Sequence, residues 1–132
     1  MTMAASIALL VARMLMASVF VFSAWGKLRG DARDLQAIIG LHLPFPNLLA
    51  KLVGACEIIG ALMLTLGVAV ELAAVLLGLF LVFVTLAFLQ FWKVTNDEAH
   101  FGTENAFFGN LGLLGGLIFL TVFGPGAYAL LP

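Results

Sequence analysis

The sequence predicts an all-α integral membrane protein: an antiparallel four-helix bundle of transmembrane spans, with a short interfacial helix after the first span. Of its 132 residues 64% are hydrophobic and only 10% are charged, whereas a soluble domain has about 25% charged residues. The apolar residues also fall into four runs, each near the length of about 20 residues that crosses a bilayer. The length suits one domain. The net charge of −1 gives no electrostatic case for nucleic acid.

The first predicted span covers residues 3–25. No positive segment precedes it, and Arg13 interrupts the apolar run, so a cleaved signal peptide is not the interpretation we favour. Ser6, Ala17 and Ala24 fall on the Arg13 face at helical spacing. Because small residues let another helix approach closely, this face is expected to point into the bundle.

The loop that follows, residues 26–47, begins next to Trp25, an aromatic residue typical of the membrane interface. Residues 31–41 have amphipathic spacing and predict a short helix lying on the membrane surface. Pro44 and Pro46 then interrupt the chain before the second span, residues 48–67. That span carries Glu57, and its face has the small residues Ala50, Gly54 and Ala61, which predict packing on a neighbour.

The third span, residues 71–92, is rich in Leu, Val and Phe and is expected to be the most lipid-exposed helix. A polar stretch, residues 93–105, is expected to form the second loop. The fourth span, residues 106–124, carries Gly109, Gly112 and Gly116 along one side, including a GxxxG match.

Basic residues predict the topology. Lys27, Arg29, Arg33, Lys51 and Lys93 all fall at one membrane face, and the termini and the turn at 67–71 carry none. The positive-inside rule therefore places loops 26–47 and 93–105 in the cytoplasm and both termini outside.

Two ionisable residues lie deep in apolar runs, Arg13 and Glu57. Counted from the loop-side ends of their predicted spans, their depths differ by about 4.5 Å at 1.5 Å per residue, which suggests an ion pair. One interpretation is a polar pocket for a headgroup, a quinone or a proton, because ionisable residues within membranes are usually functional. The other is a structural pair that sets helix register.

Further polar residues near the loop face are candidates to line a vestibule leading down to Glu57: Ser23, Trp25, Lys27, Gln90 and Asn110. The alternative for each is an interhelical hydrogen bond, worth about 0.6 kcal/mol on average. His42 and His100 fall in loops, so the spans offer no axial haem ligands and too few ligands for zinc. Cys56 is the single cysteine, which excludes a dithiol relay within one chain. We expect no metal and no intrinsic cofactor, and no catalytic residue is assigned.

An ordered set of motifs resembles the DoxX family of small four-span membrane proteins. The set comprises Arg13, FSAWGKL at 22–28, GLHLPFP at 40–46, GACEIIGALMLTLG at 54–67, FLQFW at 88–92 and NLGLLGGLIFL at 110–120. The residue before Asn110 is Gly109, where the family pattern has Lys. The resemblance implies a bacterial inner-membrane protein. Some such proteins are membrane subunits of thiosulfate:quinone oxidoreductases; others resemble assembly partners of periplasmic dehydrogenases or anchors in oxidative-stress complexes.

Two functions follow as hypotheses. The first is a redox-associated subunit with an intramembrane pocket for a quinone or lipid headgroup, acting with a partner that supplies the electrons, since this chain has no self-contained catalytic motif. The second is a non-catalytic accessory or assembly subunit whose small-residue faces dock a second copy or another membrane protein. A small transporter is a weaker third possibility because the chain has no broken helix with internal symmetry.

Overall fold

The computed structural model describes residues 2–31, 36 and 38–130. Four of its helices are long and apolar enough to cross a membrane, which confirms the predicted fold class. They are α1 (Met3–Arg29), α3 (Pro46–Leu66), α4 (Val70–Phe88) and α5 (Asp97–Phe123), with a short 3₁₀ helix, η1 (Phe91–Lys93), before α5. Of the interfacial helix predicted over residues 31–41, residues 32–35 and 37 lie outside the described residues, and residues 36 and 38–40 are helical.

The helix boundaries follow from capping residues. The Thr2 hydroxyl accepts a hydrogen bond from the Ala5 amide at the start of α1, and the Asn96 side chain accepts one from the Ala99 amide at the start of α5. Gly30 and Gly67 end α1 and α3 in the left-handed conformation. Because Asn96 caps a helix there, α5 begins at Asp97, so most of the stretch expected as a polar loop is helical.

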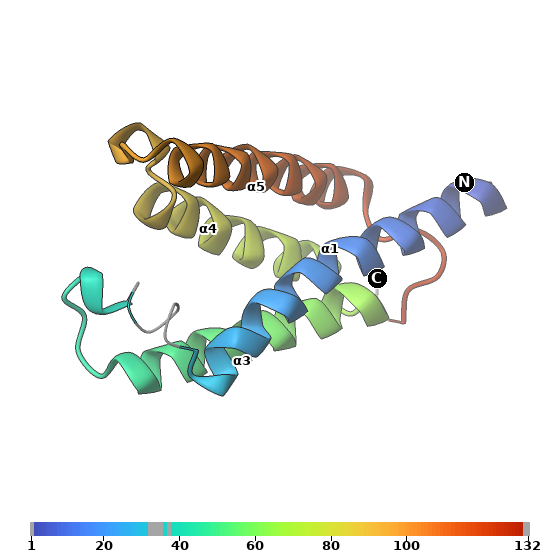
Figure 1. Ribbon diagram of the computed structural model, residues 1–132. Coiled ribbons are helices and arrows are strands. Elements are labelled where there is room, and N and C mark those ends of the chain that lie inside the picture. The colour runs from blue at the N-terminus through green and yellow to red at the C-terminus, as the bar shows by residue number, and fades with distance from the viewer. Residues whose placement is uncertain (1, 32–35, 37, 131–132) are drawn as a thin grey trace.

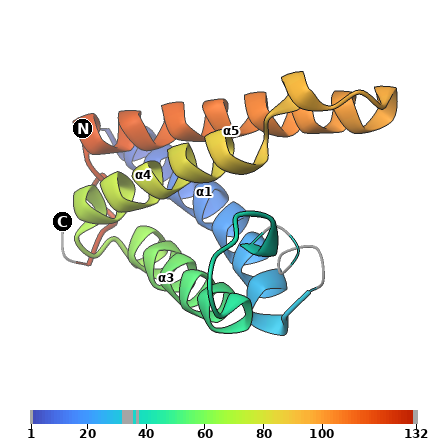
Figure 2. The same cartoon turned by 90° about the vertical axis from the view of Figure 1, so that its left-hand side faces the viewer.

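The helices form two antiparallel pairs, α1 with α3 and α4 with α5, joined through contacts between α3 and α4 (Figure 1). Contacts between α1 and α5 are few. Both termini and the α3–α4 turn lie at one end of the molecule, which we call the terminus side. The opposite end, which we call the loop side, holds the α1–α3 connection and the turn at η1. The two pairs are close at the terminus side and spread apart toward the loop side (Figure 2).

The core accordingly lies toward the terminus side. Apart from Phe20 of α1 it consists of small and aliphatic residues, among them Ala61 and Leu64 of α3, Ala73 of α4, and Leu117 and Leu120 of α5. Gly60 permits the α3–α4 approach, because a Cβ built there would lie 2.9 Å from Leu77 Cδ2.

The expectation that residues 71–92 are the most lipid-exposed is wrong. Helix α4 has seven buried residues, whereas the longer α5 has two, Leu117 and Leu120. The reason is position: α4 lies between α3 and α5 and buries residues against both. Lipid is as apolar as leucine, so a high content of Leu, Val and Phe does not distinguish a lipid-facing helix from a central one.

Candidate functional site

Arg13 is fully buried and binds backbone carbonyls at the terminus side. Its Nη1 donates a 2.8 Å hydrogen bond to the Leu64 carbonyl, and its Nη2 donates to the Tyr128 carbonyl. The carbonyls in the last turn of a helix lack intrahelical partners and carry partial negative charge. Arg13 therefore caps the end of α3 and holds the C-terminal segment, residues 124–130, against it.

Arg13 and Glu57 do not form the ion pair suggested by their depths. Leu64, which Arg13 binds, follows Glu57 by seven residues, about 10 Å along the axis of α3. Two effects separate the charges. Helix α1 continues to Arg29, so Arg13 lies sixteen residues from its loop-side end, whereas Glu57 lies eleven residues into α3. Side chains in a helix also lean toward its N-terminus, which directs Arg13 toward the terminus side.

Glu57 instead pairs with Lys27. The Lys27 Nζ atom lies 2.8 Å from Glu57 Oε1, and it donates a 2.7 Å hydrogen bond to the Ser23 hydroxyl. Because helical side chains point toward the N-terminus, the Lys27 side chain extends from the last turn of α1 toward Ser23, one turn earlier. The same tendency directs Arg13 away from Glu57. The Glu57 side chain is 3% exposed and that of Lys27 16% exposed, so the pair runs from the protein interior toward the loop side.

A close approach of α1 and α3 brings the two charges within reach. A Cβ built on Gly54 would lie 3.0 Å from Leu28 Cγ and 3.1 Å from the Ala24 carbonyl oxygen. Any larger residue at position 54 would separate the helices at the level of Lys27. The small face predicted around Glu57 therefore packs on α1, with Ala50, Gly54 and Ala61 all buried.

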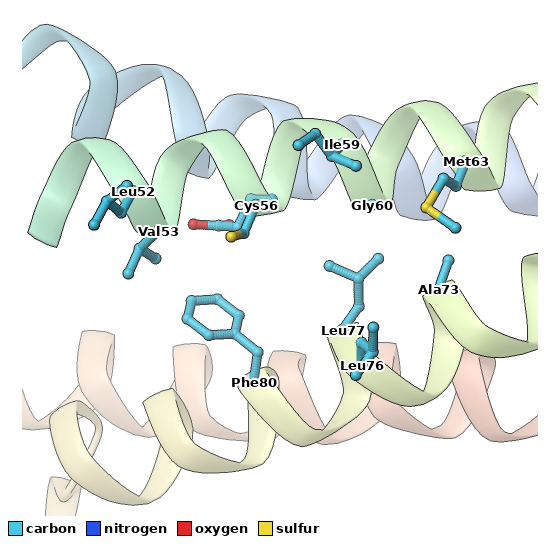
Figure 3. A pocket seen from close by; sticks show the side chains of 11 residues that line it. Leu52, Val53, Cys56, Ile59, Gly60, Met63, Ala73, Leu76, Leu77 and Phe80 are labelled. Carbon is cyan, nitrogen blue, oxygen red and sulfur yellow. The ribbon is translucent and has the colours of Figure 1, made fainter.

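A cavity of about 400 Å³ lies between α3 and α4, and Glu57 is part of its wall. Its lining is otherwise almost entirely apolar (Figure 3). From α3 come Leu52, Val53, Cys56, Glu57, Ile59, Gly60 and Met63, and from α4 come Ala73, Leu76, Leu77 and Phe80. Phe80 points from α4 toward Val53 and Cys56. We call this cavity the α3–α4 pocket. Its volume is in the range of small-molecule sites, about 300–1,000 Å³.

The other residues considered for a vestibule lie elsewhere. Gln90 Nε2 donates to the Leu86 carbonyl, and Asn110 Nδ2 donates to Thr85 Oγ1, so Asn110 joins α5 to α4. Trp25 is 57% exposed on α1, and the Arg29 guanidinium lies 5.7 Å from the centre of its ring. Of the six predicted site residues, Lys27 and Glu57 are brought together. Arg13, Trp25, Gln90 and Asn110 are not among the pocket lining.

The wall of the pocket that α4 forms, which includes Phe80 and Leu77, could not be predicted from the sequence. These residues lie in a uniformly apolar run, and nothing in the pattern separates a pocket wall from a lipid-facing surface. The Lys27–Glu57 pair had a signal in the sequence: Lys27 is one of two cations in the last turn of α1, and a side chain there leans toward the membrane interior. Among the described residues, no group of three or more His, Cys, Asp or Glu side chains is placed to hold a metal ion.

Residues 8–90, which include most of α1, all of α3 and α4 and the whole α3–α4 pocket, match the family model of DoxX. The chain belongs to the DoxX family. It is also similar to the inner membrane protein YphA of Escherichia coli (strain K12), with 27% identity over 122 residues that cover 92% of this chain and 86% of that protein. No solved structure matches. This DoxX-family chain is therefore a multi-pass membrane protein, and its resemblance to the family, inferred from motifs, is confirmed.

Proposed function

We propose that this DoxX-family protein is a redox-associated membrane subunit that binds the ring of a quinone in the α3–α4 pocket. The observation that carries the proposal is one buried, charge-paired carboxylate, Glu57, in the wall of an otherwise apolar cavity between two transmembrane helices. Such a site suits a lipid-soluble molecule with an apolar ring, a few polar atoms and an aliphatic tail. Phe80 supplies an aromatic face for the ring.

The charges near the pocket favour a quinone over a phospholipid headgroup. A phosphate would need a free cation or several donors. The nearest ammonium, Lys27, is already directed at Glu57 and Ser23, and the pocket lining contains no Lys or Arg. Arg13 binds carbonyls at the other end of α3. A neutral ring avoids the uncompensated negative charge that a phosphate would bring beside Glu57.

A subunit of this kind needs an electron donor, and the chain contains no sequence motif for one. We therefore expect it to act with a partner protein that carries the redox group. Three residues of the lining, Leu52, Ile59 and Leu76, are each more than half exposed, so the pocket borders the outer surface of the bundle and a quinone can enter from the surrounding lipid.

Binding is tested by titrating the purified protein in lipid nanodiscs with decylubiquinone and by counting bound quinone after extraction. We expect saturable binding of one quinone per chain. Leu76→Trp fills the pocket from α4 and should abolish saturable binding. Leu86→Trp is the matched control on the same helix, since Leu76 is 56% exposed and Leu86 is 55% exposed but outside the pocket. Binding that is unsaturable, or equal in the two variants, contradicts the proposal.

The second candidate, an accessory or assembly subunit, is favoured by the surface of α5. Only two of its 27 residues are buried. Cβ atoms built on Gly109 and Gly112 meet nothing within 4 Å, whereas a Cβ built on Gly116 would lie 3.0 Å from Met16 Sδ. Native mass spectrometry of protein extracted with its own lipids separates the candidates. Bound quinone supports the pocket function, and an empty protein held in fixed ratio to a larger enzyme supports the accessory function.

A further inference from the structure

The polar wall of the α3–α4 pocket has a definite hydrogen-bonding character. Glu57 is 2% exposed, and its Oε1 lies 2.8 Å from the Lys27 ammonium, the geometry of an ionised pair. An ionised carboxylate only accepts hydrogen bonds, whereas an ammonium only donates them. The donor of this pair, Lys27, is not part of the pocket lining. Of the two partners in this pair, the carboxylate is the one that belongs to the pocket lining.

The rest of the lining does not change this character. The residues from α4 are Ala73, Leu76, Leu77 and Phe80, which carry no side-chain donor. On α3 the other polar side chain is that of Cys56, whose thiol is a weak donor. Both walls belong to regular helices, so the backbone amides facing the pocket are engaged within α3 and α4.

The two redox forms of a quinone differ in the same property. The oxidised ring carries two carbonyl oxygens, which accept hydrogen bonds, and the reduced ring carries two hydroxyl groups, which donate them. A carbonyl placed against the Glu57 carboxylate leaves two acceptors facing each other, and burying such groups without a donor is unfavourable. A hydroxyl donates to the carboxylate in a charge-assisted hydrogen bond.

We propose that the α3–α4 pocket preferentially binds the quinol form, with one ring hydroxyl donating to the Glu57 carboxylate. This inference rests on the proposed quinone-binding function and adds the redox state of the ligand. A carboxylate offers about four acceptor positions, so contact with Lys27 and with a ligand hydroxyl are compatible. Contact with Phe80 is available to both redox forms and contributes affinity without selecting between them.

The expected effect follows from the strength of a hydrogen bond to a charged group. We expect quinol to bind at least about tenfold more tightly than quinone. Tighter binding of the reduced form raises the midpoint potential of the bound two-electron couple, by about 30 mV for each tenfold preference. The preference therefore has two independent readouts, a ratio of dissociation constants and a potential.

The experiment compares decylubiquinol and decylubiquinone, titrated anaerobically against the wild-type protein in lipid nanodiscs, with empty nanodiscs to subtract partition into lipid. Glu57→Gln keeps the shape of the side chain but adds an amide donor, so it should bind quinone better and reduce the ratio to near one. Glu71→Gln, at an exposed carboxylate outside this pocket on α4, should leave the ratio unchanged.

The outcomes separate this inference from the proposed function. Saturable binding of both forms with equal affinity in the wild type, or with a preference for quinone, overturns the inference and leaves the quinone site standing. A quinol preference that persists in Glu57→Gln also overturns it. Absence of saturable binding of either form refutes the proposed function and the inference with it. The wild-type ratio decides the matter without any variant, so a folding defect in Glu57→Gln does not prevent the test.

Discussion

Replacing Gly67 with alanine tests whether Arg13 and the C-terminal segment close the terminus side as described. Gly67 ends α3 with a φ of 76°, and a Cβ built there would lie 2.6 Å from the Cα of Ala129 and 2.8 Å from Arg13 Nη1. The backbone conformation alone costs alanine about 1–2 kcal/mol. Displacing a packed backbone adds about 1–3 kcal/mol. We therefore expect Gly67→Ala to lower the free energy of unfolding by about 2–5 kcal/mol.

Gly30 provides the matched control. It ends α1 with a φ of 75°, but a Cβ built there meets nothing within 4 Å. Gly30→Ala should therefore lower the free energy of unfolding by the backbone term alone, about 1–2 kcal/mol. The difference between the two variants isolates the contact of the C-terminal segment with the end of α3.

Unfolding by sodium dodecyl sulfate in mixed micelles, followed by circular dichroism, measures both variants. Carboxypeptidase digestion gives a second readout, because Gly67→Ala should release the segment held by the Arg13–Tyr128 and Leu130–Leu66 hydrogen bonds. Equal destabilisation of the two variants, within about 0.5 kcal/mol, together with equal digestion, would refute this reasoning. It would mean that the C-terminal segment does not pack against Arg13 and Gly67 at the end of α3.

Three further predictions address the pair, the helix contacts and the topology. Lys27→Met should lower the free energy of unfolding by about 3–5 kcal/mol, because it leaves a buried carboxylate without this ammonium; Lys27→Arg, which keeps the charge, should be close to wild type in the same detergent titration. Gly60→Ala should destabilise by about 1 kcal/mol or more, since its Cβ meets Leu77. Gly112→Ala, in open space, should stabilise by up to about 1 kcal/mol; a similar loss in both would contradict the packing described. In a cysteine-free background, Ala127→Cys should react with an impermeant maleimide from outside the cell and Glu98→Cys only after the membrane is opened; the reverse pattern would overturn the predicted orientation.

Much of the fold could be predicted from the sequence, because long runs of apolar residues identify membrane spans directly. The four apolar runs indicated the four helices, and the small residues around Arg13 and Glu57 indicated which faces of α1 and α3 pack together. The start of α5 could not be predicted from the sequence. Residues 97–105 are polar, and polarity in a membrane protein distinguishes water from lipid but not a loop from a helix that extends beyond the bilayer.

The candidate site was predicted only in part. Arg13 and Glu57 were identified as buried charges, and both are buried. Their partners were not, because depth estimates count residues along separate helices, whereas contacts depend on where each helix ends and on the direction in which its side chains lean. The four extra residues of α1 and that lean move Arg13 to carbonyls of α3 and bring Lys27 to Glu57.

The sequence by itself determined the membrane location, the number of spans and the presence of buried charges that each need a partner, since burying an ionisable group in lipid is costly wherever the fold places it. Only the tertiary structure decided which partner each charge takes and that α3 and α4 enclose a pocket with Glu57 in its wall. Those features depend on the angle between two helix pairs. Close packing at Gly60 joins α3 to α4 and so helps to set that angle, and a single close contact of this kind leaves no periodic signal along the chain.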